Sequence, residues 1–213
     1  MTNLVVTKPV EQIFTASIRT KLLCLIGVVI ALLSNTYAQA PTHAKIQTSM
    51  GDIIIELSPN EAPTSVTNFM EYATSGYYDR LLIHRVVKDF VIQGGGFSTL
   101  FTRRALRDPI PYEGENGLKN LRGTIAMARN DDQNSAQAQW FINLRNNKKL
   151  DHRVTDLGPI YGYAVFGHVV EGMDVADAIG DVETGSGGPF DEEVPVERIL
   201  INRIDPVEWP LAD

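Results

Sequence analysis

Residues 83 to 97 read IHRVVKDFVIQGGGF, and this stretch decides the fold. One arginine, Arg85, stands inside an apolar, β-branched run. Its guanidinium is always charged and has five N–H donors, so it must face solvent or be held at a pocket edge by hydrogen-bond acceptors. Gln93 can supply such an acceptor. If two short strands meet at a turn over residues 88 and 89, Arg85, Phe90 and Gln93 converge on one face, and a positive planar group lies beside an apolar wall.

Working outward, the rest of the chain alternates short strands with few helices. The helix from Pro63 to Gly76 shows helical spacing of apolar residues, with Thr64 and Ser65 as candidate caps. Met173 to Ile179 predicts a second helix between glycines, and Gly185 to Pro189 a turn. About eight strands in one domain leave a β-sandwich or a closed barrel. Besides the central stretch, the strands are predicted over residues 44–48, 52–57, 124–128, 139–144, 163–170 and 196–204.

The first 40 residues have the layout of a secretory signal. Arg19 and Lys21 precede the apolar segment 22–33, and Ala38-Gln39-Ala40 offers a cleavage site after Ala38 or Ala40. The apolar part is short for a membrane span, although an uncleaved N-terminal anchor is the alternative. We therefore expect a signal over residues 1–40, a single domain over 41–213 and a periplasmic location. The only cysteine, Cys24, lies inside the apolar segment, so the mature domain would have no disulfide.

Composition and motifs exclude several kinds of function. A formal net charge of -7 argues against nonspecific nucleic-acid binding. The glycines at 94–96 are not followed by the lysine and hydroxyl residue of a phosphate loop, so they indicate close backbone packing. The four histidines lack metal-ligand spacing, and no serine or cysteine nucleophile stands in a recognisable motif, so we expect no metal, cofactor or covalent intermediate.

Several charged or polar residues are interpreted as structural or surface groups. We expect His84 to face away from Arg85 and to be structurally satisfied. The arginines of the long loop 98–122 are interpreted as a solvated face, and the paired acids as surface charge. These residues are Arg103, Arg104 and Arg107, and the pairs Asp131-Asp132 and Glu192-Glu193.

A set of motifs in order along residues 44–205 resembles the cyclophilins, the peptidyl-prolyl cis-trans isomerases, and is most similar to the periplasmic type of Gram-negative bacteria. The motifs include FVIQGGGF at 90–97, RGTIAMAR at 122–129, QWFIN at 139–143 and YAVFG at 163–167, with HRV at 84–86 and NGL at 116–118. The resemblance implies a closed eight-stranded antiparallel β-barrel with two α-helices, and a substrate groove on the outer surface of the barrel.

The same resemblance implies a site. Arg85 would be the catalytic donor and Gln93 would hold it. The remaining residues would bind a proline-containing peptide, seating the proline ring and holding the residue before it: Phe90, Val91, Ala128, Arg129, Gln139, Phe141, Leu150 and Tyr163. From the residues alone, Phe90 and Phe141 have an alternative reading as core and Leu150 as a loop packer.

Amide chemistry explains why a cation belongs in such a site. Rotation about an X-Pro bond faces a barrier of about 18–20 kcal/mol because it breaks amide resonance. The twisted prolyl nitrogen gains a lone pair, so a fixed donor aimed at it stabilises the transition state more than the planar ground state. The resemblance assigns that donor to Arg85, and the clients would be unfolded exported proteins. Two alternatives stay open, a binding or chaperone module on the same barrel and a purely structural barrel.

The sequence departs from the family pattern at several positions. Ile83 stands where phenylalanine is usual, and Val91 where methionine is usual, so the pocket wall is smaller. Lys149 replaces a frequent aromatic, which implies weak binding of cyclosporin. Residues 152–162 form a connection longer than expected by about four residues. We also expect a monomer.

Overall fold

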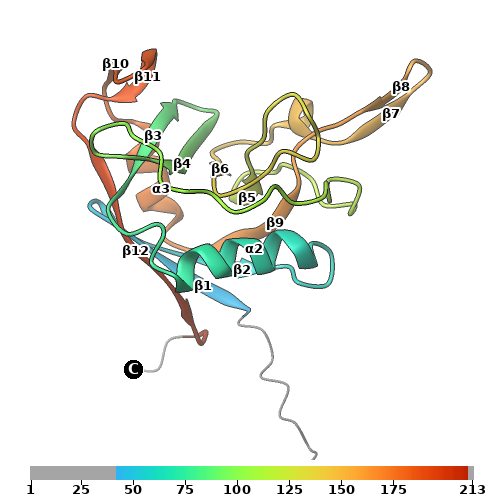
Figure 1. Cartoon of the computed structure of the whole chain (residues 1–213), viewed down its shortest axis with the longest axis horizontal. Coiled ribbons are helices and arrows are strands. Elements are labelled where there is room, and N and C mark those ends of the chain that lie inside the picture. The colour runs from blue at the N-terminus through green and yellow to red at the C-terminus, as the bar shows by residue number, and fades with distance from the viewer. Residues whose placement is uncertain (1–41, 211–213) are drawn as a thin grey trace, which may run out of the picture. The chain divides into compact units, whose positions relative to one another are not determined.

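The computed structural model describes residues 42–210, and within them eight strands close into one antiparallel barrel. The strands follow the order β1-β12-β3-β4-β6-β5-β9-β2 around the barrel, which confirms the predicted closed barrel and excludes the sandwich (Figure 1). Their bounds are β1 His43–Thr48, β2 Gly51–Leu57, β3 Leu81–Val87, β4 Val91–Ser98, β5 Thr124–Met127, β6 Trp140–Asn143, β9 Val165–Glu171 and β12 Ile199–Val207. The predicted signal lies outside the described residues.

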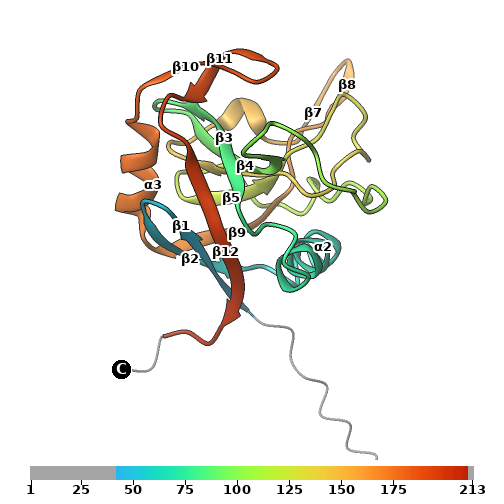
Figure 2. The same cartoon turned by 60° about the vertical axis from the view of Figure 1, so that its left-hand side comes forward.

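Two α-helices cover the barrel on opposite sides, as Figure 2 shows. They are α2, Pro63–Thr74, and α3, Met173–Gly180, close to the predicted ranges. Helix α2 buries Val66, Phe69 and Ala73 at helical spacing against the barrel core. No helix among residues 42–210 is long and apolar enough to cross a membrane.

Helix α2 begins differently from the prediction. Neither Thr64 nor Ser65 caps it with its side chain; the N-cap position is Ala62. Instead the carboxylate of Glu113 accepts hydrogen bonds from the backbone N–H of Thr64 at 2.9 Å and of Ser65 at 2.7 Å, and from the Ser65 hydroxyl at 2.7 Å. An acid at a helix start satisfies free N–H groups and complements the helix dipole, a contribution of about 1 kcal/mol. The long loop therefore supplies the cap.

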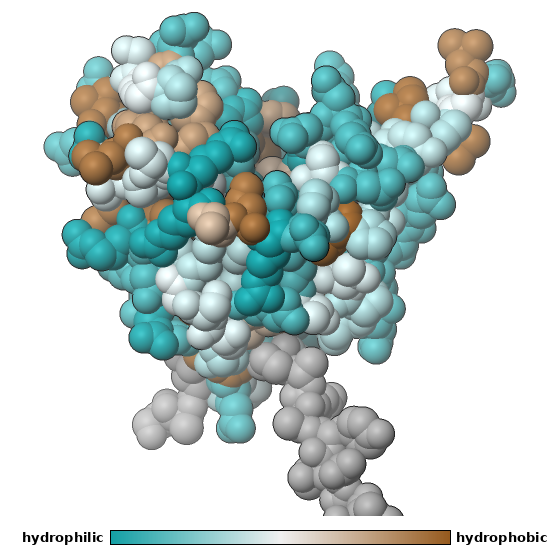
Figure 3. All heavy atoms as spheres, viewed as in Figure 1, coloured by the Kyte–Doolittle hydropathy of each residue, from teal (hydrophilic) through white to brown (hydrophobic). Residues whose placement is uncertain are grey.

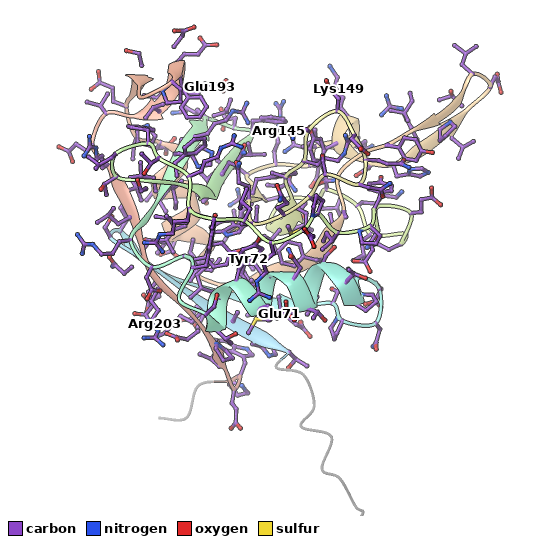
Figure 4. The ribbon with its side chains drawn as sticks, viewed as in Figure 1. Glu71, Tyr72, Arg145, Lys149, Glu193 and Arg203 are labelled. Carbon is purple, nitrogen blue, oxygen red and sulfur yellow. The ribbon has the colours of Figure 1, made fainter. Side chains whose placement is uncertain are left out.

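The arginines of the same loop are exposed, as the solvated-face interpretation expected, but two of them also fix the loop to the rest of the domain. Arg104 donates to the backbone carbonyls of Tyr77 at 2.5 Å and Asp79 at 2.7 Å. Arg107 pairs with Glu71 and lies over the Tyr72 ring, which Figure 4 places on α2. These three acceptors are far from the loop in sequence, so the local pattern carried no signal of them.

Two further hairpins and a short helix stand outside the barrel sheet. The β10–β11 hairpin, Thr184–Gly187 and Phe190–Pro195, replaces the simple turn expected over residues 185–189. The β7–β8 hairpin, Arg153–Thr155 and Gly158–Ile160, occupies the connection that was expected to be long. The 3-10 helix η1, Lys148–Leu150, precedes it. Figure 1 shows the β10–β11 hairpin at the upper left and the β7–β8 hairpin at the upper right.

Candidate active site

Strand register places the central residues of the site in one row. Arg85 on β3 pairs with Gln93 on β4, Gln93 pairs with Phe141 on β6, and Phe141 pairs with Ala126 on β5. Paired residues in antiparallel strands project to the same side of a sheet. Their neighbours Ile92, Trp140 and Ile142 fill the barrel core, so the row faces outward. The barrel thus sets a guanidinium, an amide and an aromatic ring side by side.

Arg85 is held by two partners, one predicted and one not. Its Nη1 donates to Oε1 of Gln93 at 3.4 Å, a long bond, and Gln93 in turn donates to Gln139 at 3.0 Å. Its Nε donates to Oε2 of Glu193 at 2.7 Å. The interpretation of Glu192-Glu193 as surface charge is therefore wrong for Glu193, whose side chain is one-third exposed and paired with the arginine.

The β10–β11 hairpin brings Glu193 to Arg85. The hairpin is seated by Phe190, whose ring packs edge-on against Phe97 of β4 at 5.2 Å and lies 5.9 Å from His84. Glu193 has a φ of 67°, a left-handed conformation that is unusual for a glutamate. Such a backbone persists where the surrounding structure holds it. Figure 4 shows Glu193 on this hairpin, above the barrel face.

An apolar pocket of about 180 Å³ opens next to the guanidinium. The Phe141 and Tyr163 rings meet edge to face at 5.3 Å and form one wall. The pocket side chains belong to a second hydrophobic cluster, apart from the barrel interior, in which Phe141 is buried and Phe90 is partly buried, so Phe141 both packs in a core and lines the pocket. Nine predicted site residues line it: Arg85, Phe90, Val91, Gln93, Ala128, Arg129, Phe141, Leu150 and Tyr163.

Gln139, the tenth predicted residue, lines a neighbouring pocket of about 220 Å³. Arg85, Gln93, Ala128 and Arg129 line both pockets, so the two hollows form one groove with the arginine between them. Gly96 allows this arrangement, because a Cβ there would lie 2.6 Å from the Gln139 side chain. The backbone-packing interpretation of the triple glycine is thereby confirmed.

His84 departs from its expected position. It lines the second pocket together with Arg85 instead of facing away, because the β3–β4 register shifts between Ile83 and Arg85. Its ring is 2% exposed and its Nδ1 has no hydrogen-bond partner among the described residues, so it is not fully satisfied. Burial lowers the pKa of His84 to about 4. The ring is therefore neutral at neutral pH and adds no second positive charge beside Arg85.

A buried asparagine network supports the pocket rim. Asn147 donates to the carbonyl of Phe90 at 3.0 Å and to Asn143 at 2.7 Å. Asn120 donates to the carbonyl of Leu150 at 3.0 Å and accepts from Asn143 at 3.2 Å. All three side chains are at most 4% exposed. Polar groups buried this deeply are stable only when bonded, so the network fixes Phe90 and Leu150 relative to each other.

Arg129 braces the opposite rim. Its guanidinium stacks 5.0 Å from the centre of the Tyr163 ring. It donates to the carbonyl of Gly162 at 2.9 Å and also to the carbonyl of Tyr161. Arg145 lies 5.9 Å from the Phe90 ring at the other end of the pocket. Lys149 is exposed and points away from the barrel (Figure 4), so it adds no wall to the pocket.

The chemistry of the site is that of a fixed cation beside an apolar hollow. Within residues 42–210 no group of three potential metal ligands lies together. Sequence reasoning missed Glu193 because 108 residues separate it from Arg85 and its neighbours Asp191 and Glu192 look the same. It also missed the stacking of Arg129 on Tyr163 and of Arg145 on Phe90, because the sequence around a surface arginine does not indicate which aromatic ring it contacts.

Comparisons with known proteins agree on one family. The family described as "Cyclophilin type peptidyl-prolyl cis-trans isomerase/CLD" matches residues 43–205. The chain is 46% identical over 164 residues to "Peptidyl-prolyl cis-trans isomerase A" of Dickeya dadantii, covering 77% of this chain and 84% of the relative. It is 44% identical over 157 residues to "Peptidyl-prolyl cis-trans isomerase B" of Escherichia coli, covering 74% and 94%.

A solved structure shares the fold. A cyclophilin-type isomerase of Cryptosporidium parvum, crystallised in the presence of the dipeptide Ala-Pro, superposes with a TM-score of 0.63. The two chains are 24% identical, and the match covers 78% of this chain and 99% of the other. At that identity the likeness concerns the barrel alone.

Proposed function

Because this chain belongs to the cyclophilin-type peptidyl-prolyl cis-trans isomerases, we propose that Arg85 and the pocket beside it are its active site. Enzymes of this family act on proline-containing peptides. The observation that carries the proposal is the position of Arg85. Its guanidinium stands at the junction of two pockets, braced from behind by Glu193 and Gln93.

The mechanism depends on which N–H donors of Arg85 remain available to a substrate. Nε and Nη1 donate to Glu193 and Gln93, while Nη2 makes no hydrogen bond to any residue in the range 42–210. A proline ring seated against Phe141 and Phe90 would place its nitrogen within reach of this free end. As the bond twists, the nitrogen gains a lone pair, and the fixed cation stabilises it without having to reorganise. Only the transition state presents that lone pair, so the interaction lowers the barrier.

The pocket contributes by holding one side of the bond. The aromatic wall of Phe141 and Tyr163 offers the proline ring an apolar seat. Gln139 and the backbone of Arg129, in the adjoining pocket, would hold the peptide that precedes the proline. With the ring fixed, the preceding carbonyl is the part that turns.

Replacing Arg85 with alanine is expected to lower kcat/KM for a proline-containing tetrapeptide by about 10²- to 10³-fold, the usual loss of a transition-state donor. Isomerisation would be followed by a protease-coupled assay on the domain lacking residues 1–40. Arg203→Ala, a surface arginine far from the groove (Figure 4), is the control and should keep full activity. Near-normal activity in the folded Arg85→Ala protein would remove Arg85 from the mechanism.

Replacing Glu193 with alanine should lower kcat about three- to tenfold with little change in KM, because Arg85 loses its strongest restraint but keeps its charge. Glu193→Gln, which retains an acceptor, should recover part of the rate. The matched control is Glu192→Ala, since Glu192 is exposed and one residue away. Equal effects of the two alanine variants would show that Glu193 has no special role.

We also propose that the enzyme is exported and assists the folding of exported proteins. The support is the signal-like pattern of residues 1–40, with its basic residues, apolar segment and Ala38-Gln39-Ala40. Expression of the full chain in a Gram-negative host should yield a periplasmic protein whose mass corresponds to cleavage after Ala38 or Ala40. Ile26→Arg, which interrupts the apolar segment, should keep it in the cytoplasm. Full-length wild-type protein in the membrane fraction would instead support the uncleaved anchor.

A chaperone role on the same barrel is the second candidate, favoured by the apolar β7–β8 hairpin beside the groove. The Arg85→Ala protein separates the two functions: a chaperone would still suppress aggregation of an unfolded client when isomerisation is lost.

We further propose that the protein is a monomer and binds cyclosporin weakly. The support for weak cyclosporin binding is Lys149, an exposed charge where the family often has an aromatic. Lys149→Trp should therefore tighten inhibition by cyclosporin, measured by titration in the isomerase assay, without changing the mass found by light scattering. Unchanged inhibition would show that Lys149 does not set the affinity.

A further inference from the structure

The β7–β8 hairpin carries exposed apolar side chains beside the active-site pocket. It leaves the barrel after Leu150 and returns before Tyr163, two residues that line the pocket. Leu157 at its tip is 100% exposed and Val154 is 78% exposed. The hairpin extends away from the barrel in Figure 1, and Figure 3 shows hydrophobic residues at its free end.

Nothing in the stability of the hairpin calls for these side chains. A hairpin of three residue pairs buries little, and polar residues at its tip would cost the fold nothing. Val154 pairs with Pro159 in the register, so these two residues lie on one face of the hairpin, and Leu157 lies in the turn that joins its strands. Two large apolar side chains that are this exposed on one projecting hairpin make it a candidate contact site.

The base of the hairpin packs against aromatic side chains and is continuous with the groove. Tyr112, His152 and Tyr161 form an aromatic cluster there, with the two tyrosine rings perpendicular at 5.5 Å. Arg129, which lines both pockets, donates to the carbonyls of Gly162 and Tyr161 where β8 rejoins the barrel. These contacts attach the base of the hairpin to a residue of the pocket lining.

We propose that this hairpin binds an apolar segment of the same polypeptide whose proline occupies the pocket. The proposal rests on the proposed function and names its substrate class: extended, unfolded chains with apolar residues some distance from the proline. At about 3.3 Å per residue, the tip lies roughly 15–20 Å along the hairpin from its base, and an extended substrate spans that length in about five residues. The same polypeptide can reach both sites because the hairpin is joined directly to the pocket lining at Leu150 and Tyr163.

The test compares short and long substrates with two matched variants. Leu157→Ser replaces the exposed apolar side chain at the tip. Val196→Ser replaces a 61% exposed valine that lines neither of the two pockets of the groove. Each protein is assayed by NMR exchange on a proline tetrapeptide, on a peptide of about twelve residues with leucines about five positions from the proline, and on the same peptide with serines there.

We expect Leu157→Ser to raise KM about fivefold for the leucine peptide only, as loss of one partly buried apolar contact does. The tetrapeptide and the serine peptide should be turned over equally by all three proteins. Equal KM for the leucine and serine peptides in the wild type would overturn the proposal while leaving the isomerase function intact. No activity on the tetrapeptide would instead overturn the proposed active site, and with it this inference.

Two other occupants of the hairpin give different results. If the tip joins two copies of this chain, light scattering will show a dimer that Leu157→Ser dissociates. If it inserts into lipid, the wild type will sediment with phosphatidylglycerol vesicles and Leu157→Ser will not. Either result, combined with equal KM values for the leucine and serine peptides, overturns the substrate-binding role.

Discussion

Closure of the barrel is the constraint on which the site depends. Once β3, β4 and β6 pair in their observed register, Arg85, Gln93 and Phe141 must stand abreast on the outer face. A shift of one residue in either pairing would turn these side chains into the core. The packing of Trp140, Ile92 and Ile142 inside therefore enforces the arrangement outside, and the site needs no separate device to assemble its central row.

The barrel alone does not fix the orientation of the Arg85 guanidinium. A long arginine side chain on a strand has many rotamers, and ordering it costs about 2 kcal/mol of side-chain entropy. The β10–β11 hairpin limits that freedom by presenting Glu193 to Nε, while Phe190 seats the hairpin on Phe97. Because His84 stays neutral, it adds no charge to the Arg85–Glu193 pair. The enzyme thus holds Arg85 as a positioned donor next to the pocket.

Local patterns predicted the elements well and the long-range contacts poorly. Alternation and β-branching located the barrel strands, and helical spacing located α2 and α3, because those signals are contained within a few residues. The candidate pocket residues were found through motif resemblance, and the structure brings nine of them around one hollow; their roles remain proposals. Three contacts were not predictable, because each depends on where a distant loop passes. They are the hydrogen bonds from the start of α2 to Glu113, from Arg104 to the Tyr77 carbonyl and from Arg85 to Glu193.

The pairing of the first and last barrel strands has a consequence for how the protein is made. β1 is bonded to β2 on one side and to β12 on the other, with His43 opposite Val207. The ring cannot shut until the last strand has been synthesised, so a nascent chain carries an open sheet with two unpaired edges. Such contacts between chain ends slow folding. The barrel can therefore close only after β12 has been synthesised, and until then the enzyme is itself an incompletely folded chain that contains prolines.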